Sequence, residues 1–200
     1  IITINECEGG AGVFQLTEHN ISKQENMHYD NKNNYDWSKD HFNSPAYLTV
    51  SSQLQLEAMA CSMGNVYTMN KSFRSEHSST SKHVSEFTHL EIEMVNNTFD
   101  ELMDHSEKMI KYVLNKVMDD CMEEIENLNK FISKGLKDRL ENLKNSTMKR
   151  VKYKVILEEI NRDIEEFGLK MDLLCDGDDL GSAHENYITE KYNCPVFVTH

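Results

Sequence analysis

The chain has 200 residues, of which 38% are hydrophobic and 28% charged, a balance typical of one globular domain large enough to bury a core. No apolar run approaches the length needed to cross a bilayer, and the start of the chain lacks the basic and apolar regions of a secretion signal. A net charge of −13 argues against bulk attraction to nucleic acid, so any RNA contact must be local or lie outside this chain. We therefore expect a cytoplasmic protein without a membrane or DNA partner.

The sequence predicts little regular secondary structure in residues 1–44. Residues 1–5 suit a strand, and the EGGAG segment at 8–12 suits a mobile turn, because it lacks the spacing and the closing Lys-Ser/Thr of a phosphate loop. The Asn-rich stretch at about 18–44 has no sustained periodicity and indicates a partly disordered surface insertion. We assign no metal to the histidines scattered in it, which are His19, His28 and His41.

A short strand at 46–50 leads into a helix that a serine at 51 or 52 caps and that Gly64 ends. Within this helix Gln53 and Glu57 are four residues apart and share a face. Such a pair is either a solvated surface or a means of binding an amide or ammonium group.

The segment at 66–93 is predicted to be a β-hairpin. Residues 66–74 are rich in aromatic and β-branched side chains, 75–84 form a polar loop, and 87–95 alternate with period two. One face of the second strand suits a core and consists of Thr88, Leu90, Ile92 and Met94. The other face suits the lining of a site and consists of Phe87, His89, Glu91, Glu93 and Val95.

A helical segment is predicted at about 98–144. It opens on a capping box formed by Thr98 and Glu101, and its apolar residues follow the 3-and-4 spacing of an amphipathic helix, with a break near Asn129 or Gly135.

The rest of the chain alternates short elements. A basic stretch at 148–153 is expected to enter a helix at about 154–167, followed by a short helix at about 183–192 and a strand at 194–200. The glycine of the acidic segment 176–179 is misplaced for a calcium loop, and the five cysteines lack zinc spacing. We therefore assign no metal ligand in this chain.

The segment FRSEHSSTSKHVSEFTHLEIE at 73–93 resembles motif 2 of class II aminoacyl-tRNA synthetases, which reads FRxE, a variable loop, (R/K)HxxEF and ExE. EGG at 8–10 is similar to the flipping loop of the aspartyl/asparaginyl subgroup, and YLTVSSQLQLE at 47–57 to its amino-acid-binding segment. KRVKY, DDL with Glu185, and CPVFVTH follow in the family's order. The resemblance implies an α+β fold with an antiparallel β-sheet flanked by helices.

The resemblance also implies roles for single residues. Arg74 would be catalytic, holding the α-phosphate and the substrate carboxylate, and Glu76 would accept a hydrogen bond from the adenine amino group. The implied ATP-binding set is Arg74, Glu76, Lys82, His83, Val84 and Phe87. The implied amino-acid-binding set is Glu8, Gln53, Glu57 and Arg74.

The implied reaction is ATP-dependent activation of asparagine, with Mg²⁺, and transfer to tRNA(Asn) by a homodimer. In aspartate enzymes the corresponding segment resembles SPQxxK, and its lysine pairs with the side-chain carboxylate of the substrate. Leu56 stands at the position of that lysine, which favours a substrate with a neutral side-chain amide over one with a second carboxylate. The alternatives are an aspartate-specific enzyme, a tRNA-independent asparagine-forming relative, and an inactive paralogue used for binding or regulation.

The pattern also departs from the family. The chain starts past motif 1 and stops before the late acidic magnesium ligand, the Gly-rich strand and motif 3, and Lys82 stands where arginine is commoner. We therefore expect residues 1–200 to be a partial catalytic domain that is inactive by itself.

Overall fold

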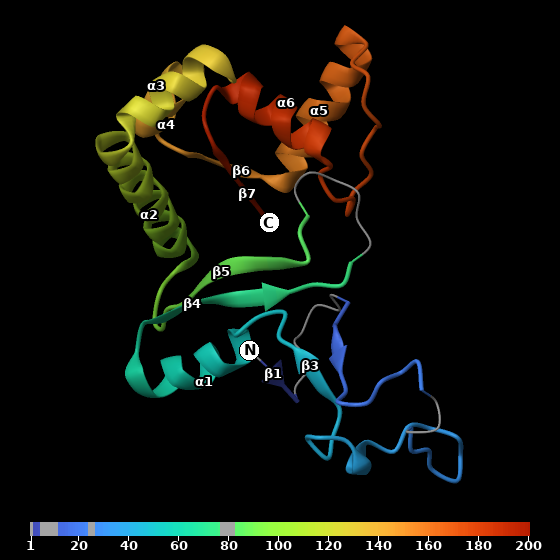
Figure 1. Ribbon diagram of the computed structural model, residues 1–200. Helices are drawn as coiled ribbons and strands as arrows, with labels where there is room; N and C mark the ends of the chain where they lie inside the picture. Colours follow the sequence, from blue (N-terminus) through green and yellow to red (C-terminus); the bar gives the residue numbers. More distant parts are fainter. Residues whose placement is uncertain (1, 5–11, 24–26, 77–82) are drawn as a thin grey trace. The chain divides into compact units, whose positions relative to one another are not determined.

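The computed structural model describes residues 2–4, 12–23, 27–76 and 83–200 (Figure 1). The chain divides into two compact units, Ile1–Asn97 and Thr98–His200, and each is described by itself. Among the described residues, no helix is both long and apolar enough to cross a membrane.

The first unit combines a small antiparallel sheet of order β1-β3-β2, a helix and an antiparallel hairpin. Its elements are β1 (Ile2–Thr3), β2 (Gln15–Leu16), β3 (Ala46–Leu48), α1 (Gln53–Met63), β4 (Val66–Phe73) and β5 (Glu86–Glu93). The predicted hairpin is confirmed, with pairs running from Val66 and Glu93 to Phe73 and Glu86. Two backbone bonds join it to the first sheet region, from Phe73 N to Thr49 O at 2.8 Å and from Ser75 N to Gly12 O at 2.8 Å.

Helix α1 ends where predicted, at Gly64, which has a φ of 84° that favours glycine. At the other end the side chain of Ser52 makes no capping bond, whereas the Ser51 hydroxyl accepts a hydrogen bond from Gln53 N at 3.0 Å. Leu56 and Ala60 are buried and one turn apart, so one side of the helix packs on the hairpin.

The face of the hairpin that α1 covers is the polar one. Ser72, which is 1% exposed, and the half-buried His89 lie on it, while Tyr67 and Leu90 on the opposite face are 73% and 44% exposed. The prediction that the Leu90 face forms a core is therefore wrong for this unit. The reason is that the polar side chains on the covered face find hydrogen-bond partners among themselves and at the start of α1.

The Asn-rich insertion holds more structure than its composition predicts. It contains a 3-10 helix, Trp37–Lys39, and a bridge between Tyr29 and Tyr35. Asp40 is 6% exposed and accepts hydrogen bonds from Glu18 N at 3.1 Å and from the Tyr35 hydroxyl at 2.9 Å. The insertion is thus anchored to the end of β2.

The second unit consists of helices and a pair of parallel strands, β6 and β7. Its elements are α2 (Phe99–Asp120), α3 (Met122–Phe131), α4 (Leu136–Asn145), β6 (Lys149–Lys152), α5 (Tyr153–Phe167), α6 (Ser182–Tyr192) and β7 (Val196–Thr199). The basic stretch that was expected to enter a helix is therefore a strand first. Its parallel partner lies 47 residues away in the sequence, which local composition cannot indicate.

The capping box of α2 is confirmed: the Thr98 hydroxyl accepts from Glu101 N at 3.2 Å, and the Glu101 carboxylate accepts from Thr98 N at 2.7 Å. The helix breaks once before the predicted point, at Cys121. The apolar spacing runs across this break, because residues on both sides pack into one core cluster, formed by Leu114, Met118 and Ile125. The next break lies between α3 and α4, near Gly135 as predicted.

A second core cluster joins α5, α6 and the segment between them, and consists of Ile156, Ile160, Leu174 and Ile188. Beside it Asp163 is 3% exposed and accepts hydrogen bonds from Lys191 and from the Tyr187 hydroxyl, the latter at 2.9 Å. The hydrogen bond from Lys191 lowers the pKa of Asp163 to about 2, aided by Tyr187 and Arg162 and opposed by burial. This carboxylate therefore ties α5 to α6.

Candidate functional site

A pocket of about 420 Å³ opens on the polar face of the hairpin in the first unit. Its walls come from the segment after β3, the start of α1, the segment after β4, and β5. They consist of Val50, Ser51, Gln53, Arg74, Glu76, His89, Leu90, Glu91, Ile92 and Glu93.

Arg74 is held at the end of the hairpin. Its backbone nitrogen donates to Ser85 O at 3.1 Å, just beyond the last strand pair, and its side chain is exposed. The guanidinium carbon lies 5.5 Å from the centre of the Phe87 ring, a cation–π contact. A planar cation beside a flat aromatic ring suits a ligand that carries both a phosphate and an aromatic base.

The Phe87 ring lies against the ring of His89. The two ring centres are 5.4 Å apart with planes tilted by 52°. His89 Nδ1 lies 3.1 Å from the hydroxyl of Ser72, so the imidazole is tied to β4. Arg74, Phe87 and His89 therefore form a row along the hairpin face.

Glu91 joins the hairpin to α1. Its carboxylate accepts a hydrogen bond from the Ser51 hydroxyl, and both of its oxygens lie 3.0 Å from Ser52 N. The residue after these serines is Gln53, whose side-chain amide donates to Glu57 at 3.0 Å. The position of Gln53 in the pocket thus depends on a residue of β5.

The charges of the pocket are mostly negative. Among the lining residues that the structure describes, Arg74 is the one permanent cation, and the acids are Glu76, Glu91 and Glu93. An ammonium or an amide group suits this lining, whereas an additional carboxylate away from Arg74 would be repelled.

The structure brings together three of the residues that the sequence singles out, since Gln53, Arg74 and Glu76 all line the pocket. Phe87 lies against Arg74 but outside the lining, and Glu57 reaches the pocket only through Gln53. His83 and Val84 are exposed in the hairpin loop and do not line this pocket. The predicted residues Glu8 and Lys82 lie outside the described residues.

Several lining residues were not assigned from the sequence. The period-two pattern of the second strand places His89, Glu91 and Glu93 on the face that lines a site, but it gives none of them a binding role. For Ser51 the sequence predicts only a role as a helix cap. Its contact with Glu91 spans 40 residues of sequence, and no local signal predicts it.

The Gly-rich segment at 8–12 ends beside the site. Gly12 O accepts from Ser75 N, and a Cβ at Gly12 would lie 2.5 Å from the Ser75 hydroxyl oxygen. A larger residue at 12 would therefore displace Ser75, the neighbour of Arg74.

Leu56 does not line the pocket that holds Arg74. It is 7% exposed and contributes to a second, mainly apolar pocket between α1, β1 and β4. Leu56 is therefore absent from the described lining of the Arg74 pocket.

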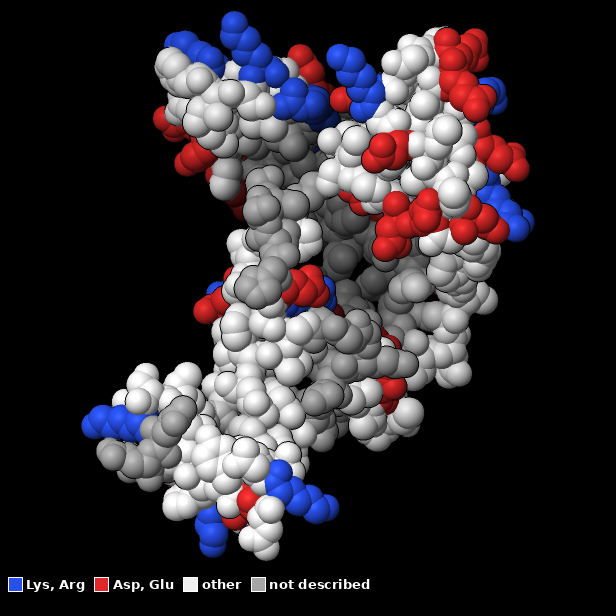
Figure 2. Space-filling model, turned by 90° about the vertical axis from the view of Figure 1, so that its right-hand side faces the viewer, with Lys and Arg blue, Asp and Glu red and all other residues white. Residues whose placement is uncertain are grey.

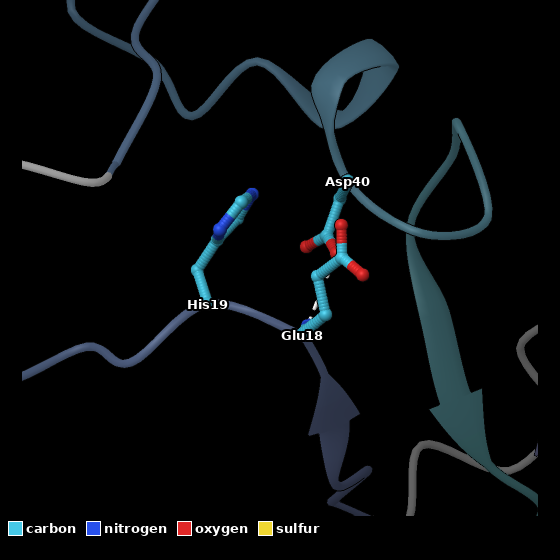
Figure 3. Close-up of side chains that lie close together, drawn as sticks. All are labelled: Glu18, His19 and Asp40. Carbon is cyan, nitrogen blue, oxygen red and sulfur yellow. Dashed lines mark hydrogen bonds between the residues drawn. The ribbon is translucent and has the colours of Figure 1, made fainter.

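Figure 3 shows Glu18, His19 and Asp40 close together in the insertion, with ligand atoms within 4.8 Å of one another. The Asp40 oxygens already accept N–H groups from Glu18 and His41 and the hydroxyl of Tyr35. Burial alone would raise the pKa of Asp40, but these bonds and one from Thr17 hold it well below its usual range. Asp40 therefore serves as an anchor of the insertion.

Residues 1–200 match the family described as tRNA synthetases class II (D, K and N). An asparagine–tRNA ligase of Clostridium botulinum strain Hall is 42% identical over the whole chain, and a Clostridium tetani one is 40% identical. The chain spans 42% of the length of each.

A solved structure with a similar fold is the asparaginyl-tRNA synthetase of Pyrococcus horikoshii complexed with asparaginyl-adenylate. It has a TM-score of 0.71 and 27% identity, and the match covers 99% of this chain and 37% of that one. An asparaginyl-tRNA synthetase of Entamoeba histolytica gives a TM-score of 0.69 and 27% identity, covering 100% of this chain and 37% of that one.

Proposed function

Because this chain belongs to the family of class II tRNA synthetases (D, K and N), we propose that its hairpin pocket is one wall of the ATP and amino-acid site of an asparagine–tRNA ligase. The observation that carries the proposal is that Arg74 lies against the Phe87 ring and lines one pocket with Glu76 and Gln53. The partial catalytic domain would act within a longer protein, whose relatives are more than twice the length of this chain.

The reaction has two steps. In the first, the carboxylate of asparagine attacks the α-phosphorus of ATP, the bond to the bridging oxygen breaks, and pyrophosphate leaves. In the second, the 3′-terminal hydroxyl of tRNA(Asn) attacks the acyl carbon, AMP leaves, and the hydroxyl proton is released. Neither step requires a nucleophile from the protein, so positioning and charge neutralisation supply the catalysis.

The residues of the pocket fit the first step. The fork of Arg74 binds an α-phosphate oxygen and the attacking carboxylate, so it neutralises charge where charge develops. The ring of Phe87 stacks on adenine, and Glu76 accepts a hydrogen bond from the adenine amino group. The exposed residues His83 and Val84 would meet the β- and γ-phosphates, together with Lys82, which lies outside the described residues. Mg²⁺ would accompany these phosphates, with its late acidic ligand in the rest of the protein.

The acidic lining favours asparagine over aspartate. The amino group of the substrate is positive and its side-chain amide is neutral, and both suit a wall that carries Glu91 and Glu93. The side chain of aspartate would bring a second carboxylate to the same wall, which like-charge repulsion disfavours. The adenylate named for the Pyrococcus horikoshii structure is that of asparagine, which supports this assignment. Gln53, Glu57 and Glu8 would complete the part of the site that binds the amino acid. The full-length protein would act as a homodimer.

The test is exchange of labelled pyrophosphate into ATP by the full-length protein with asparagine. Arg74→Ala should abolish exchange, because the carboxylate of asparagine and the α-phosphate of ATP lose the cation that binds both. The matched control is Lys71→Ala, which removes a cation from β4 that pairs with Glu86 at 3.3 Å and is exposed outside the pocket. Exchange that survives Arg74→Ala, or falls equally in both variants, would refute the assignment.

A further inference from the structure

The second unit contains a strongly basic segment in an acidic chain. Residues 130–154 hold nine of the 21 lysines and arginines but two of the 34 acids. Figure 2 shows blue side chains along the top of the upper part of the view, with red side chains beside and below them. Lysines and arginines are therefore concentrated in one segment of the sequence, as an RNA contact in a protein of net charge −13 requires.

The turn between α3 and α4 lies at the start of this segment. Phe131 and Ile132 are 72% and 77% exposed, and Lys130 Nζ lies 4.9 Å from the centre of the Phe131 ring. Lys134 follows two residues after Ile132 and is exposed. Among the described residues, neither Lys130 nor Lys134 has a carboxylate within ion-pair distance, whereas Lys137 is paired with Glu126 at 3.1 Å.

The conformation of the turn is fixed. The guanidinium of Arg139 donates to Lys134 O at 3.1 Å and to the Ser133 hydroxyl at 2.7 Å. Gly135 adopts a φ of 77°, which permits the sharp entry into α4. The two lysines and Phe131 are therefore presented on a backbone that is bonded to the following helix.

The apolar residues at the tip are not part of the unit's core. The inward side of α4 consists of Leu140 and Leu143, which pack against the cluster of α2 and α3. Phe131 and Ile132 lie outside that cluster. An exposed aromatic ring between two unpaired cations has the chemistry of a platform on which an unpaired base stacks while its phosphates are neutralised.

We propose that the turn formed by Lys130, Phe131, Ile132 and Lys134 is an RNA-binding surface, with an unpaired base on Phe131 and phosphates at the two lysines. The proposal rests on the proposed function in one respect, namely that the RNA is the tRNA substrate. RNA is favoured over a lipid surface because the two apolar side chains, Phe131 and Ile132, offer little area for insertion into a membrane.

The experiment uses the full-length protein and an unmodified tRNA(Asn) transcript, with the dissociation constant measured by fluorescence anisotropy at several salt concentrations. Phe131→Ala should weaken binding about tenfold through lost stacking. Lys134→Ala should weaken binding and make the salt dependence shallower by roughly 0.7 to 0.9 in log–log slope. The control is Lys116→Ala, which removes an exposed lysine from α2 and should change neither quantity.

A parallel assay of pyrophosphate exchange without tRNA separates the two proposals. Exchange should be unchanged in all three variants, because the turn touches neither ATP nor asparagine. If Phe131→Ala and Lys134→Ala both retain wild-type RNA affinity, the RNA-binding inference is overturned and the proposed activity is unaffected. Loss of RNA affinity in a protein that shows no exchange would uphold the inference and refute the proposed activity.

Vesicles of phosphatidylserine and phosphatidylcholine test the other class of ligand. Vesicle binding that falls in the same variants while RNA affinity stays constant would overturn the inference in favour of a lipid surface.

Discussion

Both carboxylate oxygens of Glu91 on β5 lie 3.0 Å from the backbone nitrogen of Ser52 at the start of α1. Ser52 provides no side-chain cap, and the first turn of α1 contains no acid. The carboxylate of Glu91 therefore holds the backbone just before α1, and it places a negative charge at the positive end of the helix. The hairpin and the helix that carries Gln53 are positioned by one side chain.

Glu91→Ala should lower the free energy of unfolding by about 1 to 2 kcal/mol, because Ser52 N just before α1 loses its acceptor and the start of the helix loses a nearby negative charge. Urea denaturation of the full-length protein measures the change, and hydrogen exchange at the first turn of α1 locates it. Ser52→Ala is the control and should change stability little, since its hydroxyl makes no capping bond. Equal losses in the two variants would contradict this role of Glu91.

Phe87→Leu should raise the KM for ATP in pyrophosphate exchange about tenfold, because a flat ring for the base is lost. Phe87→Tyr retains the ring and should restore most of the affinity. Thr88→Ala changes the next residue on the opposite, exposed face of β5 and serves as the control. An unchanged KM for ATP in Phe87→Leu would show that adenine lies elsewhere.

The contribution of Asp163 should depend on pH. Its hydrogen bond from Lys191, with those from Tyr187 and Arg162, lowers its pKa from the ordinary 3.8 to about 2. A lowered carboxylate pKa stabilises the fold above the unfolded value, and the contribution disappears as pH falls through the folded value. The difference in unfolding free energy between wild type and Asp163→Asn should therefore shrink between about pH 4 and pH 2. Curves that stay parallel over this range would contradict the ionic role of Asp163.

Local signals in the sequence predicted the local structure. The capping box at Thr98, the glycine end of α1 and the alternation of β5 each depend on a few neighbouring residues, and all are present. The parallel pairing of β6 with β7 and the break at Cys121 depend on packing between distant segments, and neither was predicted.

The same division holds for the site. The motif resemblance identified Arg74, Glu76 and Gln53, which the structure brings to one pocket. It did not identify the bond between Glu91 and Ser51, because the two residues meet only when β5 packs beside the start of α1. Alternation correctly separated the two faces of β5, but burial could not be assigned to them without knowledge of where α1 packs.

The central claim is that the hairpin pocket activates asparagine, and the most direct measurement compares pyrophosphate exchange by the full-length protein with asparagine and with aspartate. We predict exchange with asparagine and none above background with aspartate, because the described lining adds three acids and no second cation to Arg74. Equal exchange with the two amino acids, or exchange with aspartate alone, would contradict the account.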